Sequence, residues 1–399
     1  MGERCFYYSV CAISVCFVLG YSYIPALNLF HAYITPLFMY LLVGVAFYTT
    51  IHDRLSETIS CPRLVWTLLL WNVIILIRGY ADASDYWDYK ALIMSRTPAL
   101  LFPIIVFWGG KLNPLQKIYS FLLRVNIPLS LIVLKKVFFP LATIQFCFLI
   151  PWIGIMKRKW YLYLFIFFLI IGFDITSRAV ALRVLFGFLL FLVIRYANNI
   201  SQSVYKFLFV IMTVVPMVLV VLGYTGTFNV FEVGDSMEQN KRNEEMAADT
   251  RSFLYYKVHD KLQKENKEFI GLGGTSEYWE GYNKKFRYGG LNNKGIADKG
   301  RDHTESGLLN MYLYGGWIGA ILFSLLFIVA AHKAMFQSNS HLCKLLGLFV
   351  LFRWVISFVD EPEAWITSNI LLFYTIGLCM SYNFREKTDE EIWEWIKGF

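Results

Sequence analysis

Three short segments of the chain contain residue types suited to chemistry on a phosphate and a hydroxyl. Arg178 follows a serine, and Arg251 follows a threonine. A guanidinium binds two phosphate oxygens at once through its planar fork, so either arginine is suited to hold a phosphate or pyrophosphate. His303 stands two residues before Glu305. An imidazole with an ordinary pKa near ~6.5 can take a proton from a hydroxyl while a carboxylate orients it.

The segments belong to a chain that is far more apolar than a soluble protein. Of its 399 residues, 57% are hydrophobic, 18% are aromatic and 17% are charged, and the mean hydropathy is +0.49. Soluble domains are about one-quarter charged. A core of ordinary size could not bury so much apolar surface, so lipid must cover part of it. The composition therefore predicts an integral membrane protein.

The apolar runs predict an all-α protein with about twelve transmembrane helices, because a hydrocarbon core of about 30 Å needs about 20 residues per helix and tolerates shorter ones. The predicted spans lie near 5–22, 33–50, 64–79, 97–109, 118–134, 137–155, 160–173, 179–195, 205–224, 307–330, 344–359 and 364–382. An uncleaved first span is favoured over a secretory signal, because no clear cleavage site follows it. Residues 1–224 are assigned to nine helices, 225–306 to one large loop, 307–382 to three helices and 383–399 to a tail.

The charges between the predicted spans indicate an orientation. With a cytoplasmic N-terminus, every inner link carries at least two Lys or Arg, as the positive-inside rule requires. The outer links include an uncharged one at 22–32 and two acidic ones, which contain Asp82, Asp85 and Asp88 or Asp360, Glu361 and Glu363. Both termini are therefore expected in the cytoplasm, and the large loop is expected outside.

Some positive charges on the outer side contradict this rule and need another explanation. They are Arg78, Lys90, Arg96, Lys135, Lys136, Arg178 and Arg183. A single interfacial Lys or Arg usually extends its charge to the membrane surface. A set collected on one side also suits a site for an anionic head group. Arg124 and Arg353 fall inside spans, and Arg353 could face an interior cavity.

The large loop is predicted to contain an amphipathic helix over 244–269. Leu254, Val258 and Leu262 recur every four residues there. Gly271-Leu-Gly-Gly274 follows, and we interpret it as a helix stop rather than a phosphate-binding loop, because no clear strand precedes it.

Aromatic residues crowd the later part of this loop. Tyr278, Trp279 and Tyr282 stand among polar residues. They could stack on sugar rings, or they could form a local hydrophobic cluster that holds the loop on the membrane surface. Both interpretations stay open.

Several other classes of function are disfavoured. The formal charge of +8 does not indicate a nucleic-acid partner, because the Lys and Arg lie in short links and form no basic block. The seven cysteines lie in apolar runs or inner links, without a CxxC pair or a disulfide framework. The outer loops contain no Asp-x-Asp pair for a metal. We therefore expect no metal and no cofactor.

In their order and context, the segments around Arg178, Arg251 and His303 resemble the O-antigen polymerase/ligase superfamily of bacterial envelope glycosyltransferases. That family typically has Ser-Arg or Thr-Arg entering a span, an Arg opening a large periplasmic loop and a later Gly-x-Gly. A His-led segment then runs into a Gly-x-x-Gly helix, which Gly316 and Gly319 match. The resemblance covers 174–330 and, through topology, the whole chain. The family often has Asn after the His, whereas this chain has Thr304.

The resemblance implies a GT-C-like fold that transfers a glycan from an undecaprenyl-pyrophosphate carrier to a sugar hydroxyl, at the periplasmic face of the bacterial inner membrane. It implies that Arg178, Arg251 and Arg183 bind the pyrophosphate and that His303, with Glu305, acts as the base. The implied partners are undecaprenyl-pyrophosphate-linked glycans, membrane lipid and, as a candidate, a chain-length regulator protein.

Three functions remain open at this point. A polymerase that joins repeat units is favoured over a ligase that moves the finished glycan onto lipid A–core, although the donor chemistry would be shared. A lipid-linked glycan transporter or flippase is the alternative from another class. The chain lacks an internal repeat between its halves and a pair of broken helices, which speaks against a transporter.

Overall fold

The computed structural model describes residues 2–20, 25–132, 147–153, 160–162, 178–196, 200–224, 250–275, 278, 304, 306–360 and 366–396. Within these ranges the regular structure is helical, apart from one isolated antiparallel bridge between Ile59 and Ser381. The prediction of an all-helical polytopic membrane protein is confirmed. The described part holds six helices long and apolar enough to cross a membrane: Gly2–Gly20, His31–His52, Pro62–Asp82, Tyr86–Gly110, Gln202–Leu222 and Gly307–Phe336.

The other predicted spans have different outcomes. Those at 137–155 and 160–173 lie mostly outside the described residues. Those at 179–195, 344–359 and 364–382 coincide with helices α11 (Arg178–Tyr196), α17 (His341–Ile356) and α18 (Ile366–Met380). A total of about twelve spans stays a prediction.

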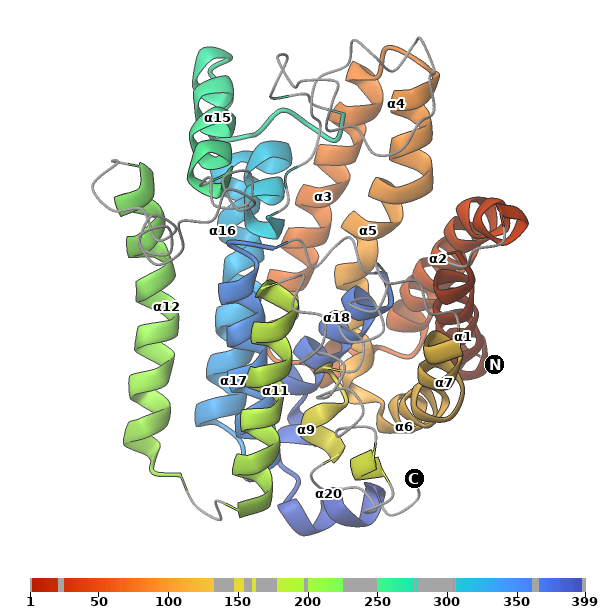
Figure 1. Cartoon of the computed structure of the whole chain (residues 1–399), viewed down its shortest axis with the longest axis vertical. Helices are drawn as coiled ribbons and strands as arrows, with labels where there is room; N and C mark the ends of the chain where they lie inside the picture. Colours follow the sequence, from red (N-terminus) through yellow and green to blue (C-terminus); the bar gives the residue numbers. More distant parts are fainter. Residues whose placement is uncertain are drawn as a thin grey trace, which may run out of the picture.

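The N-terminal part forms one side of the molecule. Helix α1 (Gly2–Gly20) packs along α2 (Pro25–His52), and a short 3-10 turn, η1 (Leu55–Thr58), leads into α3 (Pro62–Asp82). In Figure 1 the α1 and α2 pair lies at one flank, and α3 rises beside α5.

The fourth span is longer than the prediction of 97–109. A continuous helical path runs through α4 (Tyr86–Ala91), the π-helical turn η2 (Leu92–Arg96), α5 (Thr97–Leu101) and the 3-10 segment η3 (Phe102–Gly110). It starts where the Asp85 carboxylate accepts hydrogen bonds from the amides of Trp87 (2.8 Å) and Asp88 (3.0 Å), which caps the helix. The apolar run stops short of this cap because Lys90 and Arg96 interrupt it, although both belong to the helix.

The middle of the chain supplies shorter helices and one peripheral span. Described elements here are α6 (Leu112–Phe121), the π-helical η4 (Leu122–Asn126), α7 (Ile127–Ile132), α9 (Ile150–Ile153), α11 and α12 (Gln202–Tyr224). Helix α12 lies at the edge of the molecule (Figure 1). Beyond Lys206 its exposed side chains are apolar, as expected of a lipid-facing helix, and include Phe207, Val210, Val214, Val218 and Val221.

The C-terminal helices form the centre. Helix α16 (Gly307–Phe336) packs against α17 and α18, and α18 packs against η3. At the last contact Gly377 and Gly109 lie so close together that a Cβ on Gly109 would overlap the Gly377 backbone and a Cβ on Gly377 would overlap the Val106 carbonyl. Small residues of this kind let membrane helices approach.

The predicted tail contains two further helices, α19 (Tyr382–Arg385) and α20 (Asp389–Ile396). Before α20 the Thr388 amide donates to the Glu391 carboxylate (2.9 Å), and the Glu391 amide donates to the Thr388 hydroxyl (3.3 Å). This reciprocal pair is a capping box, a sequence signal that the prediction of a plain tail overlooked.

The loop helix is α15 (Thr250–Lys264). It ends earlier than the predicted 269, because a turn follows Lys264, and residues 244–249 lie outside the described part. Leu254, Val258 and Leu262 are buried, which confirms the predicted apolar face. Helix α15 packs on α16 and lies at the end of the molecule opposite α20 (Figure 1).

Candidate active site

The segment that leads into α16 is fixed at Thr304, the residue between His303 and Glu305. The Thr304 amide and hydroxyl both donate to Oδ1 of Asn310, at 2.6 and 2.8 Å, and the Asn310 side-chain amide donates to the Thr304 carbonyl at 3.1 Å. Thr304 is fully buried. His303 and Glu305 lie outside the described residues, but the backbone between them is held against the first turn of α16.

The next described residue of this segment, Ser306, joins three elements. Its hydroxyl donates to the Ser357 carbonyl at 2.9 Å, and it caps α16 by accepting from the Leu309 amide at 3.3 Å. The Tyr255 hydroxyl of α15 lies 3.3 Å from Ser306 Oγ and donates to the Phe358 carbonyl at 2.9 Å. The start of α16, the end of α17 and one face of α15 therefore meet here.

Arg251 belongs to this face of α15. It stands four residues before Tyr255, and residues four apart lie on one side of a helix. The helical backbone at Arg251 is described and its side chain is not. The same holds for Arg178, the first residue of α11.

Arg183 of α11 forms an ion pair with Asp360, just beyond the end of α17. Arg183 is fully buried, whereas the Asp360 side chain is 23% exposed. The Asp360 carbonyl accepts a hydrogen bond from the Gly307 amide at 3.1 Å, which ties this pair to the start of α16. Nε and Nη1 of Arg183 have no hydrogen-bond partner within the described part of the chain. The sequence analysis identified Asp360 only as part of an acidic link, because its pairing with Arg183 depends on how the helices pack.

Arg353 of α17 lies deeper in the same region. Its guanidinium lies 5.4 Å from the centroid of the Phe148 ring, and none of its three nitrogens has a hydrogen-bond partner among the residues that the structure describes. Phe186 of α11 stacks on Phe352 of α17, with centroids 3.9 Å apart, beside both arginines. The prediction that Arg353 could face the interior agrees with its 1% exposure.

The glycine-rich stretch 271–274 docks onto a break in α16. Gly316 adopts a φ of 62°, and the amides of Leu272 and Gly273 donate to the carbonyls of Leu313 (2.8 Å) and Tyr314 (3.0 Å). The Trp317 amide in turn donates to the Glu268 carbonyl at 2.8 Å. The loop thus satisfies backbone groups freed by the break. Gly271 lets the loop backbone approach the backbone of Tyr314 and Gly315, because a Cβ at this position would overlap them.

The remaining described cations of the predicted outer set have structural contacts. Arg78 donates to the carbonyls of Ile270 (2.5 Å) and Gly271 (2.6 Å) and so holds the docked loop. Lys90 lies 4.9 Å from the Trp87 ring, and Arg96 lies 5.3 Å from the Tyr314 ring. Contacts within the protein therefore account for these three cations without an anionic head group, and Lys135 and Lys136 lie outside the described residues.

Of the aromatic residues predicted to bind sugar, only Tyr278 is described. It is buried, with 4% of its surface exposed. This placement fits the alternative of a local cluster for Tyr278. Trp279 and Tyr282 lie outside the described residues, so their predicted role stays a prediction.

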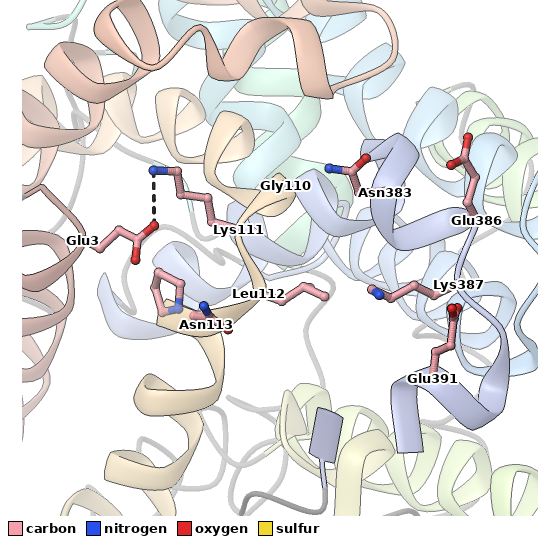
Figure 2. A pocket seen from close by; sticks show the side chains of 10 residues that line it. Glu3, Gly110, Lys111, Leu112, Asn113, Asn383, Glu386, Lys387 and Glu391 are labelled. Atoms are coloured by element: carbon pink, nitrogen blue, oxygen red, sulfur yellow. Dashed lines mark ion pairs between the residues drawn. The ribbon is translucent and has the colours of Figure 1, made fainter. Parts of the chain in front are cut away.

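A cavity of about 600 Å³ lies at the other end of the molecule, beside α20. Figure 2 shows Lys111 and Glu3 facing each other across part of it, with Asn383, Glu386 and Glu391 on another side. Lys111 bonds Asp53 at 2.8 Å and lies 3.3 Å from Glu3. Hydrogen bonds from Lys111 and His52 hold the pKa of Asp53 below its ordinary value. This cavity contains none of the predicted site residues.

Comparison with known proteins identifies the region that holds the predicted site. Residues 163–324 match the family model described as O-antigen ligase. No curated protein and no solved structure matches the chain. The matched range includes α11, α12, α15 and the first half of α16, and it contains every predicted site residue, whereas Arg353 and Asp360 lie beyond it. The chain thus carries, over residues 163–324, a domain of the O-antigen ligase/polymerase family, whose enzymes transfer glycan units from lipid-linked substrates.

Proposed function

We propose that this protein polymerises undecaprenyl-pyrophosphate-linked repeat units into O-antigen or a related surface polysaccharide. The reaction would take place at the periplasmic face of the bacterial inner membrane, with both termini in the cytoplasm. The observation that carries the proposal is the meeting of Arg183, Tyr255, Thr304 and Asp360 at one end of four helices. It supports a site built from the helices that bear Arg178, Arg183 and Arg251 and from the segment at Thr304, between His303 and Glu305.

The proposed chemistry is a glycosyl transfer with a pyrophosphate leaving group. The bond between the donor's anomeric carbon and the pyrophosphate oxygen breaks, and the acceptor oxygen bonds to that carbon. The acceptor proton passes to His303, and the pyrophosphate leaves on its lipid. Arg178, Arg183 and Arg251 would neutralise the charge that develops on the leaving oxygen.

The fixed position of Thr304 supports the role of His303 as the base. A general base must lie within about 2.6–3.2 Å of the proton it takes. A chain held at Thr304 by hydrogen bonds to Asn310 restricts where the neighbouring imidazole can reach. Glu305, on the other side of Thr304, would orient the imidazole or balance its charge.

The charges at the two ends of the molecule support the proposed orientation. Lys111 lines a cavity together with Glu391 of α20, and Arg385 donates to the carbonyl of Gln337, whose backbone amide donates to the Lys333 carbonyl. These three cations near helix ends thus lie on the α20 side, as the positive-inside rule expects of a cytoplasmic face. The end with α15 would then face the periplasm, where lipid-linked repeat units await polymerisation.

Ligation onto lipid A–core is the second candidate, because the matching family model is described as O-antigen ligase. Both reactions would use the same donor and the same arginines, and they differ only in the acceptor.

The deciding experiment incubates the purified protein with lipid-linked repeat units, with and without lipid A–core. A ladder of lipid-linked multiples without lipid A–core supports the polymerase. Product that forms only on lipid A–core shows the ligase, and no product with either acceptor contradicts both. A parallel reaction with EDTA tests the Arg-based mechanism, since loss of activity that Mg²⁺ or Mn²⁺ restores would show a metal requirement.

A further inference from the structure

Arg183 and Arg353 are two buried cations on neighbouring helices, and among the described residues only one carboxylate, that of Asp360, pairs with them. Arg183 pairs with Asp360, and Arg353 has no acidic partner among these residues. Both arginines are at most 1% exposed. The Phe148 ring beside Arg353 offers a cation–π contact, which compensates only part of the lost hydration.

An uncompensated cation is costly at such a place. Removing a guanidinium from water without an anion and without hydrogen bonds is unfavourable, and within membrane helices such groups usually mark a pathway or a ligand site. The two arginines lie on α11 and α17, which are pressed together by the Phe186–Phe352 stack. Among the described residues, the positive charge of Arg353 is therefore not balanced by an anion.

We propose that Arg353 is a second cation of the donor site and that, together with Arg183, it binds the pyrophosphate of the lipid-linked donor. Asp360 occupies Arg183 while the donor is absent, and the donor's phosphate displaces it. This inference rests on the proposed function, and it adds two residues beyond the matched family range.

The geometry of α17 supports a site that opens outward. Arg353 lies three residues before the end of α17, and Asp360 lies four residues beyond that end. Asp360 is partly exposed at the outer end, and Arg353 is buried below it. A pyrophosphate that enters past Asp360 meets Arg183 first and Arg353 next. The guanidinium nitrogens without a partner would then receive phosphate oxygens as acceptors.

Three variants separate this role from a structural one. Arg353→Met removes the unpaired cation at similar volume, and Asp360→Asn removes the counter-ion of Arg183. Arg385→Met is the matched control, because Arg385 is also buried but donates to the Gln337 carbonyl at 3.0 Å, near α20. Each protein in nanodiscs is measured for thermal stability and for its affinity for undecaprenyl pyrophosphate.

We expect Arg353→Met to keep or raise the ligand-free melting temperature and to weaken carrier binding about 10- to 150-fold, the loss of one charged hydrogen bond. Asp360→Asn should lower the ligand-free melting temperature and tighten carrier binding, because the competing carboxylate is gone. Arg385→Met should lower stability and leave the affinity unchanged.

Parallel titrations with inorganic pyrophosphate and with nanodiscs of phosphatidylglycerol identify the source of the phosphate. A rise in melting temperature with undecaprenyl pyrophosphate, but with neither inorganic pyrophosphate nor phosphatidylglycerol, supports the lipid-linked donor. The inference fails if Arg353→Met lowers the ligand-free melting temperature as Arg385→Met does and binds the carrier normally. In that case wild-type transfer of lipid-linked glycans still supports the proposed function, whereas a wild-type protein that neither binds the carrier nor transfers glycan contradicts that function itself.

Discussion

Asn310 holds Thr304 by three hydrogen bonds that involve both ends of its side-chain amide. Asn310 lies in the first turn of α16, and Thr304 lies between the two residues predicted to take and balance a proton. The Thr304 hydroxyl donates to Asn310 and to the Ser306 carbonyl, so this side chain helps to anchor the backbone of the segment.

Asn310→Leu should impair both stability and turnover. The change leaves the buried Thr304 amide without its acceptor and the Thr304 carbonyl without its donor, whereas the Thr304 hydroxyl can still donate to the Ser306 carbonyl. Each unpaired group costs about 1–3 kcal/mol. It should also reduce the transfer rate more than the affinity for the carrier, because the backbone at Thr304, next to the predicted base, loses its anchor. The measurements are thermal unfolding in detergent and the rate of product formation.

Asn72→Leu is the control for this prediction. Asn72 is 2% exposed, and its side-chain amide donates to the Leu100 carbonyl at 2.7 Å, a bond that joins α3 to α5 and does not involve Thr304. This variant should lose stability and keep the wild-type rate in the folded fraction. Equal rates for Asn310→Leu and Asn72→Leu would remove Asn310 from the site.

Arg178→Lys and Arg251→Lys should each lower turnover although the charge is kept, because an ammonium cannot reproduce the bidentate fork. The loss of one charged contact costs about 1.5–3 kcal/mol, so the rate should fall about 10- to 150-fold. Arg63→Lys is the control, since Arg63 is exposed near the start of α3. Wild-type rates in both site variants would identify the two residues as interfacial anchors.

The long apolar helices could be predicted from the sequence because hydropathy alone determines them. The predicted span 307–330 became α16 from Gly307 onward, and α12 matched 205–224 closely. The fourth span was predicted too short because Lys90 and Arg96 lie on its outer turns, where each makes a cation–π contact with an aromatic ring. Hydropathy treats such residues as loop.

The contacts between distant segments could not be predicted in the same way. The charge of Asp360 was visible, but its partner Arg183 lies on another helix, and only the packing of α11 on α17 brings them together. Likewise the Gly-x-x-Gly motif of Gly316 and Gly319 was visible in the sequence. That α16 breaks there depends on the loop 268–273, which supplies hydrogen-bond partners to the broken turn.

Gly316→Ala should loosen this docked loop. Gly316 has a positive φ, and a Cβ there would overlap the Phe269 carbonyl, so the change should cost about 1–3 kcal/mol or more. Protease cleavage between α15 and α16 should speed up along with the drop in melting temperature. Gly44→Ala in α2 provides the contrast, because a Cβ there meets open space. It should be neutral or stabilising, and an equal loss in both variants would contradict the docking role.

Cysteine labelling tests the orientation. A cysteine at Asn293 should react with a membrane-impermeant reagent from the periplasmic side, and one at Lys157 or Lys159 should not, because the charge pattern assigns these positions to opposite faces. The wild-type protein is its own control: Cys61 is exposed on the side assigned to the cytoplasm and should stay unlabelled. Labelling of both engineered positions from outside would contradict the topology.

His303→Ala should nearly abolish product formation while membrane insertion stays intact. General-base catalysis typically contributes about 10²–10⁴-fold, and alanine removes it entirely. The wild-type rate should also fall as the pH drops through the histidine pKa, ordinarily near ~6.5, because only the neutral imidazole accepts a proton. Rates are measured at saturating donor between about pH 5 and pH 8, which covers about 1.5 pH units on either side of that pKa.

The affinity of His303→Ala for the lipid-linked donor distinguishes the base from a phosphate ligand. A base acts on the acceptor, so the variant should bind the donor as the wild type does and fail to extend it. His259→Ala is the matched control: His259 Nδ1 lies 2.8 Å from the Tyr312 hydroxyl in the α15–α16 contact, so this change should affect stability rather than turnover. If His303→Ala loses donor binding instead, His303 belongs with the arginines, and Glu305 or Asp360 becomes the candidate base.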